Sequence, residues 1–219
     1  MFKISNKTLK IIFKILFVIF IAFFVSNLFL RLMYPVNYGD YIEKYSKNFG
    51  VDPYLVAAII NVESKYDEDA RSHKDARGLM QISLVTGEWA FTELNIDGYT
   101  LDKLYEPETN IMVGCWYLNV LQEEFNGDLR LVLAAYNGGS GNVSKWLKDE
   151  KYSKDGKTLD RIPYKETEEY VNKVLRYNEI YRKVYKNGFM EEERFIKNNF
   201  VYLINNFKKL LKKFVTIVR

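Results

Sequence analysis

The stretch that decides the fold of this chain is Val51–Gln81, with the sequence VDPYLVAAIINVESKYDEDARSHKDARGLMQ. Asp52 is predicted to cap a helix, because its side chain can accept a hydrogen bond from a free backbone N–H of the first turn. Pro53 suits the first helical position, where its missing N–H costs nothing. Val51 and Val56 occupy the two positions of a hydrophobic staple. We therefore expect a helix that begins at Pro53.

An acidic residue, Glu63, lies near the end of this predicted helix. Apolar residues recur at helical spacing and define one face: Leu55, Val56, Ile59 and Ile60. Glu63 follows on the same face, where burial and the negative end of the helix dipole both raise the pKa of a carboxyl. A carboxyl that is neutral near pH 7 can act as a general acid. The pattern leaves open the alternative that Glu63 ends the helix and turns to solvent.

Composition favours a folded domain without a metal or cofactor. The chain has 219 residues, of which 48% are hydrophobic, enough for a sizeable core. Its net charge of +4 is mild, and outside the C-terminal tail no Arg-rich patch with interleaved aromatics predicts binding to nucleic acid. One cysteine, Cys115, and one histidine, His73, make neither a disulfide nor a zinc-type ligand set. The acids at positions 67–69 lack the spacing and the glycine of a calcium loop.

The first 33 residues predict a membrane anchor. Lysines precede an apolar stretch, so we assign residues 1–10 to a cytoplasmic N-terminus and residues 11–33 to a single transmembrane helix. No small-x-small cleavage site follows, which favours an uncleaved anchor over a removed signal peptide. A buried core helix is the third alternative. The positive-inside rule then places everything that follows the helix outside the cytoplasm.

Residues 34–190 are expected to form one mainly α-helical domain, since no segment shows a convincing period-two pattern. Helices are predicted within residues 34–50, after Asp52, from Pro107 to Gly127, from Leu129 to Tyr136 and from Thr167 to Lys186. Polar loops are expected at residues 64–77 and 148–160. Residues 88–109 are predicted to be irregular, with Gly98 and Pro107 as breakers.

The pattern changes in residues 191–219, which predict a basic amphipathic helix. Its apolar stripe follows alternating steps of four and three residues: Ile196, Phe200, Leu203, Phe207, Leu210, Phe214 and Ile217. Lysines occupy the other faces. Such a helix suits docking on an anionic membrane surface, packing back on the domain, or self-association in a coiled coil.

Five short motifs occur in order along the domain: Glu63-Ser64, Ala70-x-Ser72, Gly78-Leu79-Met80-Gln81, Ala134-Ala135-Tyr136-Asn137-Gly138-Gly139, and Ile162-Pro163-Tyr164 with Thr167 and Tyr170-Val171. Their order and spacing resemble the catalytic domain of the soluble lytic transglycosylases, which has a goose-type-lysozyme-like fold. The resemblance covers about residues 41–185. It includes middle-helix positions as well: Pro107, Asn110-Ile111, Gly114 and Tyr117-Leu118.

The resemblance implies one-acid catalysis without a cofactor. That family cleaves the β-1,4 bond between N-acetylmuramic acid and N-acetylglucosamine in peptidoglycan, and the matching catalytic position is Glu63. The acid protonates the glycosidic oxygen, and the carboxylate then takes a proton from the muramoyl C6 hydroxyl, which closes a 1,6-anhydro ring. Most glycosidases use two carboxylates instead. One acid of the polar loop remains open as a second carboxylate: Asp67, Glu68, Asp69 or Asp75.

Further roles follow from the resemblance alone. Ser72 and Gln81 are expected to hydrogen-bond sugar acetamido groups or the peptide stem, and Gly78 to let the backbone approach the substrate. Met80 is expected to line the cleft. The ordinary alternatives are a loop hydrogen bond for Ser72 and a core position for Met80.

Three residues of the later motifs receive roles in the same way. Tyr136 and Asn137 are expected to contact the sugar, and Tyr170 to donate its hydroxyl toward Glu63. The alternatives are a core position for Tyr136 and a helix stop for Asn137. The chain departs from the family at Asp75, where Gly is frequent, and at Ser83, where a bulky apolar residue is frequent.

The sequence therefore predicts a membrane-anchored, single-pass lytic transglycosylase that faces the cell wall and acts on peptidoglycan strands. A lysozyme-type hydrolase on the same fold is one alternative. A non-catalytic, wall-binding subunit of an envelope-spanning machine, docked through residues 191–219, is another.

Overall fold

The structure is a computed structural model that describes residues 6–186, 188 and 189. The chain divides into two compact units, Met1–Pro35 and Val36–Arg219, and each is described by itself. The amphipathic helix predicted for residues 191–219 lies outside the described residues.

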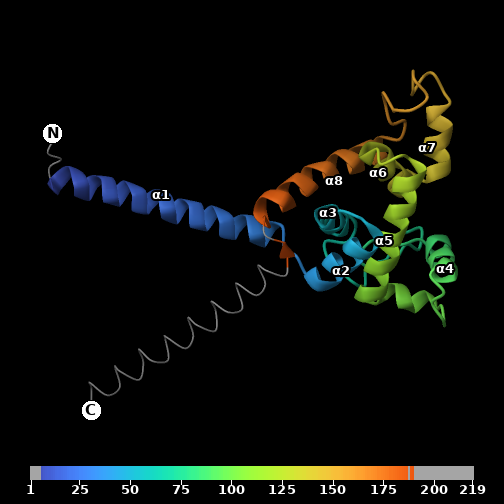
Figure 1. Cartoon of the computed structure of the whole chain (residues 1–219), viewed down its shortest axis with the longest axis horizontal. Helices are drawn as coiled ribbons and strands as arrows, with labels where there is room; N and C mark the ends of the chain where they lie inside the picture. The colour runs from blue at the N-terminus through green and yellow to red at the C-terminus, as the bar shows by residue number, and fades with distance from the viewer. Residues whose placement is uncertain (1–5, 187, 190–219) are drawn as a thin grey trace, which may run out of the picture. The chain divides into compact units, whose positions relative to one another are not determined.

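The first unit contains one long helix, α1 (Asn6–Met33; Figure 1). Within it, Lys10–Arg31 is long and apolar enough to cross a membrane by length and composition. Its large apolar side chains are exposed, from Ile11 to Met33. A helix with apolar side chains on all sides suits the interior of a bilayer.

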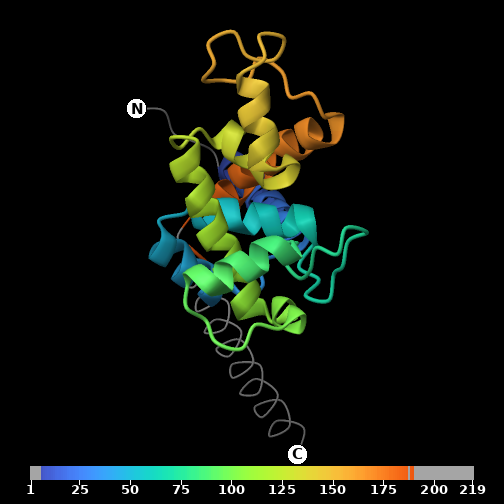
Figure 2. The same cartoon turned by 90° about the vertical axis from the view of Figure 1, so that its right-hand side faces the viewer.

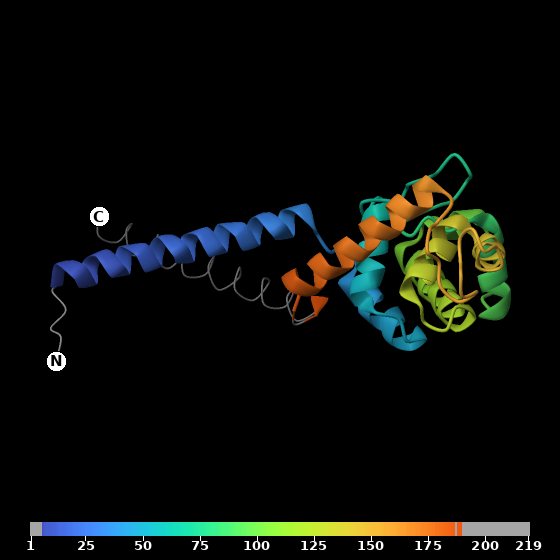
Figure 3. The ribbon, with the colours of Figure 1, turned by 90° about the horizontal axis from the view of Figure 1, so that it is seen from above.

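The second unit is built of helices, and its described residues contain no strand beyond isolated bridges. In chain order the helices are α2 (Gly39–Phe49), α3 (Pro53–Glu63), α4 (Leu84–Glu93), the short 3-10 helix η1 (Leu101–Tyr105), α5 (Pro107–Glu124), α6 (Leu129–Gly138), α7 (Ser140–Leu147) and α8 (Lys165–Val184). Figure 2 shows α3 in the middle of this unit with other helices around it. The longest of its neighbours, α8, packs along α3 (Figure 3).

The central helix α3 forms as the sequence predicts. Asp52 accepts a hydrogen bond from the Tyr54 N–H at 3.2 Å, and Pro53 is the first helical residue. All residues from Leu55 to Ile60 are buried, so the helix is covered on every side and not on one face alone. Glu63 is its last residue. Because α3 is packed on all sides, Glu63 at its end is held in a fixed position relative to the other helices of the unit.

One prediction about the helices is wrong, and one helix was not predicted. The stretch predicted to be irregular holds most of α4 and all of η1, because Ser83 caps α4 by accepting from the Thr86 N–H at 3.1 Å. The helix α6 ends within residues 137–139, at Gly138, but α7, which follows directly, was not predicted. Gly138 stays helical at a close contact between α6 and α8, where a Cβ would lie 3.2 Å from the Thr167 hydroxyl.

A buried amide in α5 holds the loop between α3 and α4. The Asn110 Nδ2 donates to the carbonyl oxygens of Arg77 at 2.9 Å and Leu104 at 2.6 Å, and its Oδ1 accepts from the Met80 N–H at 2.7 Å. Gly78 lies against this amide with φ +71°, and a Cβ there would meet Leu104 O at 2.2 Å. A residue with a side chain would be strained at this φ and would also collide with the Leu104 carbonyl, so this position requires glycine.

The single cysteine lies in the core beside these contacts. Cys115 is fully buried in α5, and burial raises the pKa of its thiol to about 12. The thiol is therefore protonated at neutral pH, and Cys115 acts as a small core residue, as the sequence predicts.

We predict that Asn110→Ala destabilises the protein. It leaves one buried N–H and two buried carbonyls without their partner, and the expected loss in the free energy of unfolding is about 3 kcal/mol or more. Urea denaturation followed by circular dichroism measures it. Asn48→Ala on the exposed surface of α2 is the control and should change stability by about 0.5 kcal/mol or less. Equal effects of the two substitutions would contradict this role of Asn110.

Candidate active site

A cleft of about 510 Å³ opens around the end of α3. Of the residues that the sequence predicts for the site, five line it: Glu63, Ser72, Gln81, Tyr136 and Asn137. They come from α3, from the loop that follows it and from the end of α6. Segments far apart in the sequence therefore meet at one carboxyl group.

Glu63 carries the chemistry of this cleft. Burial raises the pKa of its carboxyl to about 7, and the negative charge of Glu166 acts in the same direction. Tyr170 and the positive charge of Lys173 lower the pKa, but by less. Near neutral pH the group is thus poised between acid and carboxylate. One residue can then donate a proton and later accept one.

Two tyrosines lie beside Glu63, and their hydroxyls are used differently. The Tyr136 Oη donates to the Met80 carbonyl at 2.9 Å, so this ring is fixed against the loop. The Tyr170 Oη is buried and has no hydrogen-bond partner among the described residues, although it lies near enough to Glu63 to lower its pKa. A buried hydroxyl without a partner is costly and needs an explanation, and a role in catalysis is one.

Ser72 and Gln81 are partly engaged within the protein. The Ser72 Oγ accepts from the N–H groups of Lys74 at 3.3 Å and Ala76 at 3.0 Å. The Gln81 Nε2 donates to the carbonyls of Ala70 at 3.0 Å and Gly78 at 2.9 Å. The Ser72 O–H and the Gln81 amide oxygen are the atoms left to contact a substrate.

The structure does not place Gly78 or Met80 on the cleft surface. Gly78 packs against Leu104 and Asn110, so its missing side chain serves internal packing and not an approach to substrate. Met80 is fully buried. Its side chain lies against Gly114, where a Cβ would be 2.2 Å from the Met80 sulfur. Both residues therefore support the wall of the cleft from the protein interior.

Further residues, for which the sequence predicts no role in the site, also line the cleft: His73, Lys74, Ala76, Ser83, Gly138, Asn142, Tyr164, Glu166 and Thr167. Glu166 is the only other acid among them. It stands between Tyr164 and Thr167 of the last motif, a position that could have drawn attention to it. Asn142 lies on α7, a helix that was not predicted.

The acids proposed as a second carboxylate do not line the cleft. Glu68 accepts from the Tyr38 hydroxyl at 2.6 Å, and Asp67 accepts from the Asp69 N–H at 3.1 Å. Asp75 is engaged with arginines. The prediction that one of these acids assists Glu63 therefore finds no support in the geometry, and Glu166 takes their place as the candidate.

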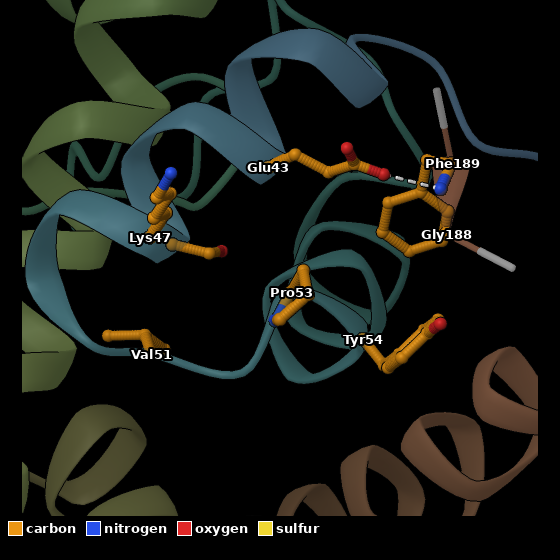
Figure 4. A pocket seen from close by; sticks show the side chains of 8 residues that line it. Glu43, Lys47, Val51, Pro53, Tyr54, Gly188 and Phe189 are labelled. Atoms are coloured by element: carbon orange, nitrogen blue, oxygen red, sulfur yellow. Dashed lines mark hydrogen bonds between the residues drawn. The ribbon is translucent and has the colours of Figure 1, made fainter. Parts of the chain in front are cut away.

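A second hollow, of about 420 Å³, lies among α2, α3 and Phe189 (Figure 4). Its acid, Glu43, accepts from the Phe189 N–H at 2.5 Å, as the dashed line in Figure 4 marks. The Glu43 carboxylate thus ties the end of the described chain to α2. The cleft at Glu63 is the stronger candidate for chemistry, because its acid has a strongly raised pKa.

Comparison with known proteins gives consistent matches. A family model described as the transglycosylase SLT domain matches residues 40–159. The soluble lytic murein transglycosylase of Escherichia coli K12 is 33% identical over 151 residues, which cover 68% of this chain and 23% of that protein. The membrane-bound lytic murein transglycosylase C of Edwardsiella ictaluri is 35% identical over 124 residues, which cover 52% of this chain and 34% of that protein.

A solved structure matches the fold as well. It is that of an inactive variant of the lytic transglycosylase Slt from Pseudomonas aeruginosa, with 34% identity and a TM-score of 0.64. The match covers 70% of this chain and 25% of that one. These findings confirm the resemblance and the mainly α-helical fold predicted from the sequence. The chain spans about a quarter of the length of the Escherichia coli relative.

We predict that the Glu63 carboxyl makes stability depend on pH. Its folded pKa of about 7 lies above the usual 4.5, so between these values the folded state binds more protons than the unfolded state. The stability contributed by the protonated group is present below about pH 4.5 and is lost as the pH rises to about 7.

Glu63→Gln removes this titration. We expect the variant to gain stability over the wild type as the pH rises through this window, by about 3 kcal/mol at pH 8. Melting temperatures at pH 5 and pH 8 measure the difference. The control is Glu150→Gln in an exposed loop, which should follow the wild type. Parallel curves for wild type and Glu63→Gln would show that the carboxyl is not perturbed.

Proposed function

Because this chain belongs to the transglycosylase SLT domain family, we propose that it is a membrane-anchored peptidoglycan lytic transglycosylase in which Glu63 acts first as acid and then as base. The observation that carries the proposal is the Glu63 carboxyl, with a pKa raised to about 7, in a cleft that also presents Ser72, Gln81 and Asn137. Both relatives named above are described as lytic murein transglycosylases.

The proposed reaction needs no water. The protonated Glu63 gives its proton to the oxygen of the β-1,4 bond between N-acetylmuramic acid and N-acetylglucosamine, and the bond from C1 to that oxygen breaks. The Glu63 carboxylate then takes the proton of the muramoyl C6 hydroxyl. As that proton leaves, the oxygen of the C6 hydroxyl bonds to C1 and closes the ring. The products are a 1,6-anhydro-muramoyl end and a free 4-hydroxyl, and Glu63 is protonated again. Burial supports the first step, because it keeps the carboxyl neutral.

Tyr170 is proposed as a positioning residue for Glu63. Its hydroxyl lowers the pKa of the carboxyl, which means that it favours the carboxylate. That preference is useful after the proton has left, when the carboxylate must face the C6 hydroxyl. The absence of another partner among the described residues leaves this hydroxyl available to Glu63.

We also propose that α1 anchors the enzyme to the cytoplasmic membrane by a single pass. Its apolar span supports this, as does the similarity to transglycosylases named as membrane-bound. The lysines before the span favour a cytoplasmic N-terminus, so residues 34–190 are proposed to be the extracytoplasmic catalytic domain. The docking role of residues 191–219 stays a prediction, because they lie outside the described residues.

One observation favours a second candidate function, a lysozyme-type hydrolase. Glu166 lines the same cleft, and its charge acts on Glu63. A second carboxylate in the cleft is the group that would activate a water in place of the C6 hydroxyl. The chemical nature of the products separates the two reactions.

The first experiment is the digestion of purified peptidoglycan by the detergent-solubilised full chain, with mass spectrometry of the soluble products. We expect 1,6-anhydro-muramoyl ends, and Glu63→Gln should lower turnover by about 10²-fold or more because the proton source is gone. Glu150→Gln is the control and should retain full turnover. Reducing ends would favour the hydrolase and Glu166, and more than about a tenth of wild-type turnover in Glu63→Gln would rule out its role.

Tyr170→Phe should separate positioning from chemistry. We expect turnover to fall about tenfold, which is less than for Glu63→Gln, and the alkaline limb of the pH–rate profile to move to higher pH because a group that lowers the pKa of Glu63 is gone. Stability should stay equal or rise, since a buried hydroxyl without a described partner is removed. An unmoved alkaline limb would argue against any action of Tyr170 through Glu63.

A further inference from the structure

One wall of the cleft is a small hairpin, residues 71–77, which lies between α3 and α4. Arg71 and Arg77 form an antiparallel bridge across its base. The Ser72 N–H donates to the Ala76 carbonyl at 2.9 Å, and the Asp75 N–H donates to the Ser72 carbonyl at 3.0 Å. The turn is therefore closed by backbone bonds, and it presents His73 and Lys74 at its tip.

Asp75 fixes the base of the hairpin with its side chain. Its φ is +62°, in the left-handed region that favours glycine, which gives a physical reason for the glycine that is frequent here in the resembled family. In this chain the residue supplies a carboxylate as well. That carboxylate pairs with Arg77, with one contact at 3.3 Å, and with Arg71, and these arginines lower the pKa of Asp75.

Arg77 links the hairpin to the rest of the unit. Its side chain is buried, lies 3.6 Å from the Asp102 carboxylate and covers the Tyr105 ring at 5.3 Å. The backbone of Arg77 is held too, because its N–H and carbonyl exchange hydrogen bonds with Ile82 at 3.0 Å. The hairpin is thus pinned at its base by charges that are already paired, and its tip is held in one place.

The two basic side chains at the tip are not paired in this way. His73 and Lys74 are exposed, line the cleft and make no side-chain hydrogen bond or ion pair with another described residue. They do not serve Glu63 either, because the charges that act on the pKa of Glu63 are those of Glu166 and Lys173. Two N–H donors in the cleft therefore stand apart from the proton chemistry.

We propose that the His73–Lys74 tip is a subsite for a carboxylate of the peptide stem carried by the muramoyl unit. The inference rests on the proposed function and names the substrate feature that the same cleft selects. The acetylated sugars of a glycan strand carry no charge while the lactyl group of the muramoyl unit is amide-linked to a stem, whereas the stem peptides themselves end in carboxylates. An exposed lysine beside an imidazole provides N–H donors for such a group, and a tip held rigidly by Asp75 loses little freedom on binding.

The test compares two substrates made from one peptidoglycan preparation that is free of other wall polymers. One keeps its stems, and the other has been stripped of them by an amidase, after which the lactyl carboxylates that the amidase exposes are capped as amides. The measured quantity is the preference, which is the kcat/KM on stem-bearing strands divided by that on stripped strands. We expect Lys74→Gln to lower this preference about two- to fivefold, the range for one exposed ion pair, and His73→Gln in addition to lower it further.

Two control variants test whether the effect depends on the positive charge at position 74 and on its location in the cleft. Lys74→Arg keeps the cation and should keep the preference. Lys47→Gln makes the same charge change on α2, outside the cleft, and should leave the preference unchanged. If stripped strands are cut too slowly to measure, the same ratio is taken from co-sedimentation of the Glu63→Gln protein, with and without Lys74→Gln, on the two substrates.

The outcomes separate the two claims. A preference that falls in Lys74→Gln and is retained in Lys74→Arg and Lys47→Gln supports the subsite. Equal losses on both substrates, or no loss on either, would overturn it while leaving the transglycosylase in place. A wild-type protein that neither cuts nor binds either substrate would overturn the proposed function, and the subsite with it.

Discussion

The side-chain amide of Asn110 is the interaction on which the geometry of the cleft depends. It satisfies the Met80 N–H and the carbonyls of Arg77 and Leu104, all without access to water. The Met80 carbonyl in turn accepts from Tyr136, so the order set by one amide in α5 passes through the loop to the end of α6. Because a buried amide must bond all of its polar atoms, few other positions of this loop are compatible with the fold.

The cleft combines two kinds of electrostatics. Around Glu63 burial outweighs the groups that favour the carboxylate, Tyr170 and Lys173, and this raises the pKa of the carboxyl at the end of a buried helix. In the hairpin next to it the charges of Asp75, Arg71 and Arg77 are paired, and they build a rigid support. Proton transfer needs the first environment, and a fixed shape of the wall needs the second. The two lie close together because the loop after α3 folds back on itself through backbone hydrogen bonds, such as the one from the Gly78 N–H to the Ala70 carbonyl.

The sequence could predict α3 and Glu63 because local signals decide them. A cap at Asp52, a proline at the first position and an apolar run all act within one helix, and each is visible without knowledge of the neighbours. The start of α5 at Pro107 was predictable for the same reason. The five motifs then supplied what periodicity alone could not, namely which acid to choose.

Features that depend on packing between elements were missed. Gly78 and Met80 read as cleft residues, but their roles follow from Leu104, Asn110 and Gly114, which no local pattern joins to them. The helix α7 was missed because a glycine pair is a strong stop signal, and the contact of Gly138 with α8 is invisible in the sequence. The places of Glu166 and Lys74 in the cleft likewise depend on how distant segments meet.

The burial of Cys115 has a practical consequence. The only thiol of the chain is closed off in the core and protonated at neutral pH, so reagents that modify thiolates have no natural target on the folded protein. A cysteine introduced at an exposed position, such as His73→Cys, would be the single reactive handle of an otherwise unaltered chain. Spin labels or fluorophores attached there would report on the cleft directly, without the removal of native cysteines that such labelling usually requires.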